Sequence, residues 1–345
     1  MSHRIAVVIL NWNTRNFLEK FLPDVIKFSG DSAQVFVVDN GSTDDSVNFV
    51  ETHFHTVSVI RNEKNEGFTG GYNSSLFKID AEYFLILNSD VQVTENYLEP
   101  LIRLMDSNPK IGACQPKILS FHEPEQFEYA GAAGGFIDKY GYPFCRGRIF
   151  NSIEKDENQY NNSIPIFWAS GACMFVRSKL FNELGGFDDK FFAHMEEIDL
   201  CWRMKHAGYS IYFVPTAKVF HVGGGTLAKS NPRKTYLNFR NNLLMLYKNS
   251  PEKTLNSVLY MRMILDFLAS VKFLLNGSFK DFKAVWNARK DFKTLKSSYS
   301  RPFSKDGVNK SLSGKLIYPK SILWDYYLCG RRTFTSLDWK IKEEN

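Results

Sequence analysis

The chain has 345 residues, of which 44% are hydrophobic and 23% charged; this is the composition of a globular protein and excludes a disordered or fibrous one. The net charge of +6 is unevenly distributed, because residues 1–228 contain 20 Lys and Arg against 28 Asp and Glu, whereas residues 229–345 contain 23 against 9. The basic C-terminal part predicts an anionic partner. Since the sequence has no zinc-finger or RNP-like pattern, we expect a membrane surface and no nucleic acid.

Residues 4–90 alternate apolar runs of strand length with amphipathic segments of helix length. We expect strands over 4–10, 34–40, 57–62 and 83–90, and helices over 14–29, 42–54 and 70–79, the second helix beginning at Ser42 or Thr43 as its N-cap. This alternation predicts a parallel sheet with helices on both faces. The first apolar run is therefore interpreted as a strand and not as a signal peptide, and the expected compartment is the cytosol.

Polar side chains follow each of these four predicted strands. The carboxyl ends carry Asn11 and Asn13, Asp39 and Asn40, Asn62 and Asn65, and Asn88 and Asp90. At any one strand end a turn is the simpler explanation, because Asn and Asp favour turns. Four such ends at one edge of a sheet instead predict a ligand crevice, because open α/β sheets bind ligands beyond the carboxyl ends of their strands.

The pattern is weaker between residues 110 and 165, where Gly, Tyr and Asn are frequent and the acidic segment 154–162 is predicted to be a surface loop. Beyond it we expect a strand, a helix and a Gly-Gly turn within 166–192, a helix over 195–208 that ends at Gly208, and a strand over 209–215. The five cysteines are scattered without a CxxC pair, which predicts reduced, mostly buried thiols and neither disulfides nor a zinc site.

Six sequence blocks occur in the order found in family-2 glycosyltransferases: "VVILNWN", "VVDNGSTDDS", "NEGFTGGYNSSL", "LILNSDVQV", "FWASGACMFVRSKLFNELGGFDDKFFAHMEEIDLCWR" and "VFHVGGGT". The chain resembles this family over roughly residues 4–250 and looks closest to its bacterial rhamnosyltransferase-like branch. The resemblance implies an α/β GT-A fold, with a Rossmann-like nucleotide-binding domain and a mainly parallel central sheet over residues 1–250. A helical, basic region over residues 251–345 would follow.

The resemblance also implies a metal site. Asp90 of "NSD" takes the place of the metal-ligating carboxylate in a triplet usually written DxD, in which Asn88 here replaces the first Asp. His221 matches the histidine that completes the coordination, and a structural histidine at a strand end is the alternative. The implied cofactor is a divalent metal, Mn²⁺ or Mg²⁺, which would neutralise charge on a leaving nucleoside diphosphate.

An attacking hydroxyl must lose a proton, and "MEEIDLCWR" offers three carboxylates for this catalytic role. By family position Glu197 is the catalytic carboxylate, although that residue is more often Asp. Glu196 is its competitor, and Asp199 shares a helix face with Glu196. Because acids also favour the first turn of a helix, we expect that preference to explain one of the three.

By resemblance the nucleotide-binding residues are Asn11, Trp12, Asp39, Asn65, Gly67, Asn73 and Asn88. Asn11 and Trp12 would lie near the base and Asp39 would hydrogen-bond a pyrimidine, while the others would line the ribose and diphosphate. Gly67, Gly70 and Gly71 fit neither a P-loop nor the Rossmann glycine spacing. Trp168 and Gly171 are expected to face the acceptor, and a core position for Trp168 is the equal alternative.

The predicted function is an inverting, metal-dependent glycosyltransferase that moves a sugar from dTDP-rhamnose or a UDP-sugar to a saccharide or lipid-linked glycan in bacterial polysaccharide synthesis. A catalytically decayed nucleotide-sugar-binding or scaffold protein is one alternative, and the joint presence of Asp90, Glu197 and His221 speaks against it. A nucleotidyltransferase is a less favoured alternative, because "LNWNTRN" is a poor version of the glycine-rich loop it needs.

Two helices are expected in the basic C-terminal region. Residues 255–275 are strongly apolar, but Arg262 and Asp266 lie four apart and share a helix face with Ser270. Residues 279–296 interleave Lys and Arg with Phe and Trp, as interfacial helices do. We expect peripheral attachment to the cytoplasmic face of the inner membrane without a spanning segment. Packing on the catalytic domain or a role in a homo-oligomer is the alternative.

Overall fold

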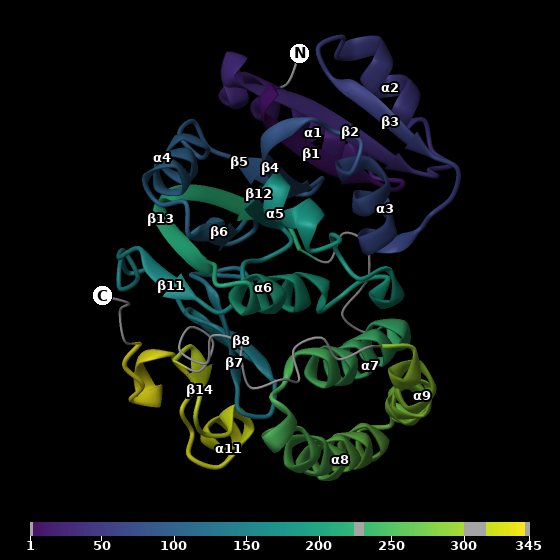
Figure 1. Cartoon of the computed structure of the whole chain (residues 1–345), viewed down its shortest axis with the longest axis vertical. Helices are drawn as coiled ribbons and strands as arrows, with labels where there is room; N and C mark the ends of the chain where they lie inside the picture. Colours follow the sequence, from purple (N-terminus) through teal and green to yellow (C-terminus); the bar gives the residue numbers. More distant parts are fainter. Residues whose placement is uncertain (1–2, 224–230, 300–314, 342–345) are drawn as a thin grey trace.

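The computed structural model describes residues 3–223, 231–299 and 315–341. Its larger sheet has nine strands and lies in the upper part of Figure 1, with helices on both faces. The lower part holds a five-stranded sheet and the C-terminal helices. Two buried apolar clusters fill the molecule, and the strands of the large sheet contribute to both of them.

Four parallel strands form one half of the large sheet, in the order β4-β1-β2-β3, and three helices connect them. They are β1 (His3–Asn11), β2 (Ala33–Asn40), β3 (Ser58–Asn62) and β4 (Ala81–Asn88), with α1 (Arg15–Ser29), α2 (Ser46–His53) and α3 (Gly67–Leu76). The register pairs Asn11 with Asp39 and Asn40 with Asn62. The polar strand ends therefore meet at one edge, as predicted.

The predicted start of α2 at Ser42 or Thr43 is wrong, since the helix begins at Ser46. The side-chain oxygen Oδ1 of Asn13 accepts hydrogen bonds from the backbone N–H groups of Thr43 at 2.7 Å and of Asp44 at 3.2 Å. These two groups thus tie the loop after β2 to the loop after β1, and the helix starts only beyond them.

The other half of the sheet is mixed. It contains β5 (Val91–Val93), β6 (Ile111–Ser120), β11 (Ile164–Ile166), β12 (Cys173–Arg177) and β13 (Ser210–His221), together with α4 (Glu99–Ser107), α5 (Ser178–Glu183) and α6 (Glu196–His206). β12 runs antiparallel between β4 and β6, and β13 runs parallel to β6. β13 does not end near residue 215 as predicted, because a register shift between Val214 and Lys218 lets it continue to His221.

The segment with the weakest sequence pattern contains most of the small sheet. β7 (Gly135–Asp138), β8 (Pro143–Cys145), β9 (Arg148–Ile149) and β10 (Ser152–Ile153) form it together with β14 (Ile317–Tyr318), which pairs in parallel with β7. The acidic segment 154–162 has no helix and is mostly exposed, as expected. It is nevertheless anchored, because the carboxylate of Asp156 binds Nζ of the buried Lys117 at 2.7 Å.

The C-terminal part is helical, with α7 (Pro232–Asn249), α8 (Glu252–Leu275), α9 (Phe279–Leu295) and α11 (Ile322–Tyr327). α7 packs against α6, α8 and α9. α11 returns to the small sheet, where the backbone N–H of Ile322 donates to Asp138 at 3.0 Å. A domain boundary at residue 250 stays a prediction. All five cysteines are free, four of them buried. Among the described residues, no helix is both long and apolar enough to cross a membrane.

Candidate active site

Asn11 and Asp39 brace the loops at the carboxyl edge of the parallel strands. Nδ2 of Asn11 donates to Oδ1 of Asp39 at 3.0 Å and to Oγ of Ser46 at 2.8 Å. Oδ2 of Asp39 accepts the backbone N–H of Ser42 at 3.2 Å. Both side chains are buried, whereas the neighbouring Trp12 is 37% exposed. Turn chemistry thus accounts for the amide and the carboxylate, and contact of these three residues with a nucleotide base stays a prediction.

The loop before α3 is locked against the turn that precedes α6. Nδ2 of Asn40 donates to Asn65 Oδ1 at 3.2 Å and to the carbonyl of Gly67 at 2.9 Å. Gly67 has a φ of +75°, and a Cβ there would lie 2.5 Å from the carbonyl oxygen of Phe192. That same oxygen accepts the backbone N–H of Phe68 at 2.7 Å. The first N–H groups of α3 therefore bind protein, which explains why its glycines fit no phosphate-binding pattern.

The side-chain amide of Asn73 on α3 also binds the segment that precedes α6. Its Nδ2 donates to the carbonyl of Phe187 at 2.8 Å and to Asp189 at 2.6 Å, and its Oδ1 accepts the N–H of Phe187 at 3.0 Å. These bonds assign Asn73 to positioning the turn. By contrast, the side chain of Asn88 is half-buried and has no hydrogen-bond partner among the described residues, so its amide is available to a ligand.

Asp90 and His221 lie together across the β5–β13 pair, in which Val91 is opposite His221. Oδ1 of Asp90 is 3.1 Å from Nε2 of His221, and both residues are buried. The other ring nitrogen, Nδ1, is 3.2 Å from the carboxylate of Glu128, which is also buried. The imidazole is therefore held between two carboxylates.

The electrostatics of this trio follow from its burial. Burial raises the pKa of Asp90 and of Glu128, but the neighbouring His221 outweighs that effect and holds both pKa values below their ordinary range. Burial lowers the pKa of His221, whereas the two carboxylates raise it, with a net pKa of about 10. The ring is thus protonated near neutral pH, and a metal ion at Nε2 would displace that proton.

Asp90 and His221 fit a divalent cation as two of its ligands. Adjacent ligands of an octahedral ion, at about 2.1 Å from the metal, lie about 3 Å apart, which matches the separation of Oδ1 and Nε2. Metal-ligating histidines usually have an orienting carboxylate at the remote ring nitrogen, and Glu128 lies at that position, 3.2 Å from Nδ1, without forming a hydrogen bond to it. No cluster of three or more ligating side chains occurs within the described ranges, so water and a diphosphate would supply the other ligands. No local sequence pattern indicates a role for Glu128.

A strained turn leads into α6. Phe192, His194 and Met195 have positive φ angles of 65°, 71° and 73°, which cost non-glycine residues about 1–3 kcal/mol each. Nδ2 of Asn241 on α7 reaches the carbonyls of Phe191, Ala193 and His194 at 2.8–2.9 Å. This buried amide stabilises the turn. Sequence reasoning missed it, because an Asn within a helical segment has no distinctive pattern.

The three carboxylates of α6 have different surroundings. Oε2 of Glu196 and Oε2 of Glu197 are buried and have no hydrogen-bond partner in the part of the chain that the structure describes. Burial raises the pKa of Glu197 to about 7, partly opposed by backbone N–H groups at the helix start. Burial and the charge of Glu197 raise the pKa of Glu196 well above its ordinary range.

Asp199, the third predicted catalytic candidate, is completely engaged. Its carboxylate accepts from Arg203 at 2.8 Å, Lys248 at 2.9 Å and Asn249 at 2.8 Å. Burial raises its pKa, but the two cations outweigh that effect and lower it. We therefore assign Asp199 to the packing of α6 on α7, and of the three acids it is the one that needs no catalytic explanation.

Trp168 lies in the core and not on an acceptor surface. It is 3% exposed, its Nε1 donates to the carbonyl of Phe136 at 2.9 Å, and a Cβ at Gly135 would lie 2.1 Å from its ring. The structure therefore favours the core alternative for Trp168. Gly171 is buried, and a Cβ there would lie 3.0 Å from the ring of Phe68. A role for Gly171 in acceptor binding stays a prediction.

Short contacts connect the two halves of the site. The backbone N–H of Asn88 donates to the carbonyl of Ala172 at 3.0 Å. Oγ of the adjacent Ser170 donates to the carbonyl of Ala130, whose own N–H binds Glu128. These contacts connect the strand edge at Asn88 to residues 170–172 and to the histidine–carboxylate trio.

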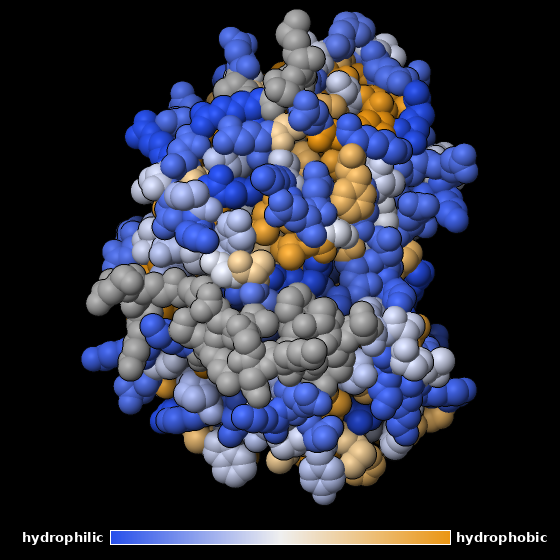
Figure 2. All heavy atoms as spheres, in the orientation of Figure 1, coloured by the Kyte–Doolittle hydropathy of each residue, from blue (hydrophilic) through white to orange (hydrophobic). Residues whose placement is uncertain are grey.

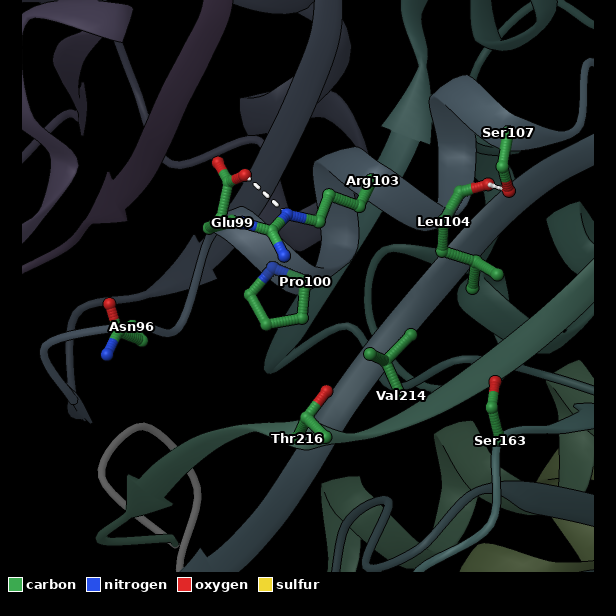
Figure 3. A pocket seen from close by; sticks show the side chains of 9 residues that line it. All are labelled: Asn96, Glu99, Pro100, Arg103, Leu104, Ser107, Ser163, Val214 and Thr216. Carbon is green, nitrogen blue, oxygen red and sulfur yellow. Dashed lines mark hydrogen bonds and ion pairs between the residues drawn. The ribbon is translucent and has the colours of Figure 1, made fainter.

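A separate open groove of about 670 Å³ lies beside α4 and β13 (Figure 3). Its charged side chains pair with each other, since Glu99 accepts from Nε of Arg103 at 2.7 Å. The lining residues are Asn96, Glu99, Pro100, Arg103, Leu104, Ser107, Ser163, Val214 and Thr216. None of them was predicted as a site residue, and we do not assign the reaction to this groove.

The chain is similar to known proteins in sequence and in fold. The family model described as "Glycosyl transferase family 2" matches residues 6–185, more than half of the chain. The N-acetylglucosaminyl-diphospho-decaprenol L-rhamnosyltransferase of Mycobacterium tuberculosis is 27% identical over 239 residues, which cover 64% of this chain and 76% of that protein. The rhamnosyltransferase WbbL of Escherichia coli K12 is 29% identical over 143 residues, covering 41% and 53%.

Solved structures support the fold. GalNAc-T7 with UDP, GalNAc and Mn²⁺ superposes with a TM-score of 0.59 at 15% identity, covering 100% of this chain and 59% of that one. Residues 1–349 of Staphylococcus aureus TarS superpose with a TM-score of 0.55 at 15% identity, covering 84% and 80%. The expected GT-A fold is confirmed, and the family match leaves no support for nucleotidyl transfer.

Proposed function

The chain belongs to glycosyl transferase family 2, and from this premise we propose an inverting, metal-dependent transfer from a nucleoside-diphosphate sugar to a saccharide or lipid-linked glycan. The observation that carries the proposal is the pair Glu196 and Glu197, whose buried Oε2 atoms have no partner among the described residues. Unpaired buried carboxylates reduce stability, and such groups are typical of reacting sites.

We propose Glu197 as the general base. Its pKa of about 7 lies near the operating pH, where a base is both ionised and able to take a proton. The acceptor hydroxyl would give its proton to Glu197 while its oxygen bonds to the anomeric carbon. The bond from that carbon to the diphosphate oxygen breaks on the opposite side and its electron pair leaves with the diphosphate, which inverts the anomeric centre.

At the donor end, the free amide of Asn88 and the exposed face of Trp12 would contact the nucleotide, next to the edge braced by Asn11 and Asp39. Asp90 and His221 would hold the divalent cation, with Glu128 orienting the imidazole. When bound, that cation offsets the negative charge of the leaving diphosphate. The Mn²⁺ named with GalNAc-T7 supports this assignment.

The relatives support a choice of substrates within the proposal. Because two of them are named as rhamnosyltransferases, we favour dTDP-rhamnose over a UDP-sugar as donor. The diphospho-decaprenol in the name of the mycobacterial relative supports a lipid-linked glycan as acceptor and hence a role in bacterial polysaccharide synthesis.

The test is a donor panel with the full chain. Purified protein is incubated with Mn²⁺ and dTDP-rhamnose, UDP-hexoses or UDP-N-acetylhexosamines, and release of the nucleoside diphosphate is measured with and without saccharide acceptors. We expect release with one donor class, at least about a hundredfold slower turnover for Glu197→Gln, and a smaller loss for Glu196→Gln. Thermal shifts with nucleotide should be the same for all three proteins.

Two results would contradict the proposal in different ways. If Glu196→Gln is the more damaging substitution, the base is the neighbouring residue. If no donor is turned over while nucleoside diphosphates still raise the melting temperature, the chain is a nucleotide-sugar-binding protein without activity.

A further inference from the structure

α8 packs on the protein with its polar face. The residues it buries are Leu255, Arg262, Asp266 and Ser270, three of which are polar. Arg262 binds Asn242 on α7, the carbonyl of Tyr140 at 3.2 Å and Asp266 at 3.2 Å. This network fixes the rotation of α8 about its own axis.

The opposite face of α8 is apolar and exposed. It presents Tyr260 (63% exposed), Met263 (47%), Phe267 (52%), Leu268 (56%), Leu274 (46%) and Leu275 (80%). At 100° per residue these side chains fall within an arc of roughly 140°, whose centre lies about 135° around the helix from that of the buried stripe. Figure 2 shows hydrophobic side chains at the lower edge of the molecule, where Figure 1 places α8. Exposure of so continuous an apolar surface to water is unfavourable and indicates a binding surface.

α9 extends this surface with aromatic rings and basic side chains. Trp286 of α9 is 49% exposed and contacts Phe267 of α8, with ring centroids 6.4 Å apart. By helical spacing, Lys283, Lys290 and Lys293 share the exposed face with Trp286. An aromatic and basic face of this kind is typical of helices that lie at a lipid headgroup boundary.

The exposed charges of both helices have almost one sign. The exposed charged residues are Lys253, Lys272, Lys280, Lys283, Lys290 and Lys293 against Glu252. The acids of α9 are bound inward, because Asp281 accepts from Thr235 and Asp291 from Tyr236, both on α7. The surface around the apolar face is therefore cationic.

We propose that the outer face of α8 and α9 docks on an anionic lipid bilayer, with the α8 side chains in the acyl boundary and the lysines at the headgroups. A second copy of the chain fits less well, because a two-fold interface would bring the same lysines of both copies together. The inference does not depend on the transferase activity, and it would place the site next to lipid-linked substrates.

The test is co-sedimentation of the full chain with phosphatidylglycerol vesicles and with phosphatidylcholine vesicles. We expect binding to the anionic vesicles that weakens with salt, and at least tenfold weaker binding for Leu268→Glu/Leu275→Glu and for Lys283→Glu/Lys290→Glu. Each substitution is at an exposed position and should leave the melting temperature unchanged. The control Lys78→Glu/Lys179→Glu makes the same charge change at exposed positions near α3 and on α5, and should bind like the wild type.

Either of two results would overturn the proposal. One is equal binding of the control and the Lys283→Glu/Lys290→Glu variant, which would reduce the effect to net charge. The other is a wild-type protein that does not bind anionic vesicles at low salt and elutes as a dimer in size-exclusion chromatography, while the Leu268→Glu/Leu275→Glu variant elutes as a monomer. That outcome would assign the face to a second copy.

Discussion

Substitution of Asn241 should disturb the strained turn before α6 without changing any residue at the carboxyl edge of the parallel strands. Its amide is buried and reaches three backbone carbonyls in residues 191–194 at 2.8–2.9 Å. Leu has the same number of side-chain heavy atoms but no donor, so all three carbonyls lose this bond, although that of Phe191 keeps its bonds from Arg240 and from the N–H of Ala193. With about 1 kcal/mol for each of its two N–H groups and for the bond that its Oδ1 accepts from Nε of Arg240 at 2.9 Å, the free energy of unfolding should fall by about 3 kcal/mol. The turn also holds positive φ angles at His194 and Met195, which will relax once the donor is gone.

The expected result for Asn241→Leu is a loss of turnover with donor binding retained. A displacement of Glu197 by about 1 Å should reduce kcat by about a hundredfold. The Kd for the nucleoside diphosphate, measured calorimetrically with Mn²⁺, should stay within twofold. The control is Leu101→Ala, a buried residue of α4, with a stability loss of similar size, about 3 kcal/mol, and normal turnover well below its melting temperature. Equal kcat for the two variants would refute the positioning role of Asn241.

The remaining predictions concern the acids of the site. Asp90→Ala should abolish the Mn²⁺ dependence of nucleoside-diphosphate binding in a thermal-shift assay, and unchanged dependence would remove Asp90 from the metal site. Glu128→Gln should raise the Mn²⁺ concentration for half-maximal binding by about tenfold or more, because the imidazole loses its orienting carboxylate. Turnover should rise with pH through about 7 as Glu197 loses its proton, and a rate that is flat across that range would exclude Glu197 as the base. Asp199→Asn should lower the free energy of unfolding by about 3 kcal/mol, since the buried Arg203 loses its carboxylate partner, whereas Lys248 keeps Asp188 at 2.6 Å. Because the pKa of Asp199 is depressed, this stabilisation is complete above the unfolded pKa of about 4 and is lost as the pH falls below it. A variant as acid-sensitive as the wild type would contradict that assignment.

The parallel half of the sheet could be predicted because each of its strands is a short apolar run that ends in a polar residue. The pairing of the antiparallel strands and the whole small sheet could not, since they join segments far apart in the chain. β14 (Ile317–Tyr318) pairs with β7 (Gly135–Asp138). These segments have only two and four residues, and neither has a sequence pattern that indicates the other as its partner. Among the site residues, motif order predicted that Asp90 and His221 lie together, and their side chains are 3.1 Å apart, whereas a common site with Glu197 stays a prediction. Glu128 and Asn241 act through a contact across the fold and have no local pattern.

α8 shows how a correct pattern can leave the orientation of a helix undecided. The sequence predicts a helix with one polar stripe and an apolar remainder, and the usual assignment would bury the apolar side. In the structure the polar stripe is the buried side, because Arg262 donates to Asn242 of α7 and Asp266 accepts from Arg289 of α9. These contacts between elements fix the rotation of the helix, since turning it would separate Arg262 from Asn242 and Asp266 from Arg289. Because these polar contacts hold the polar stripe against the protein, the apolar face of α8 points outward. A bilayer at that face would remove its exposed apolar side chains from water.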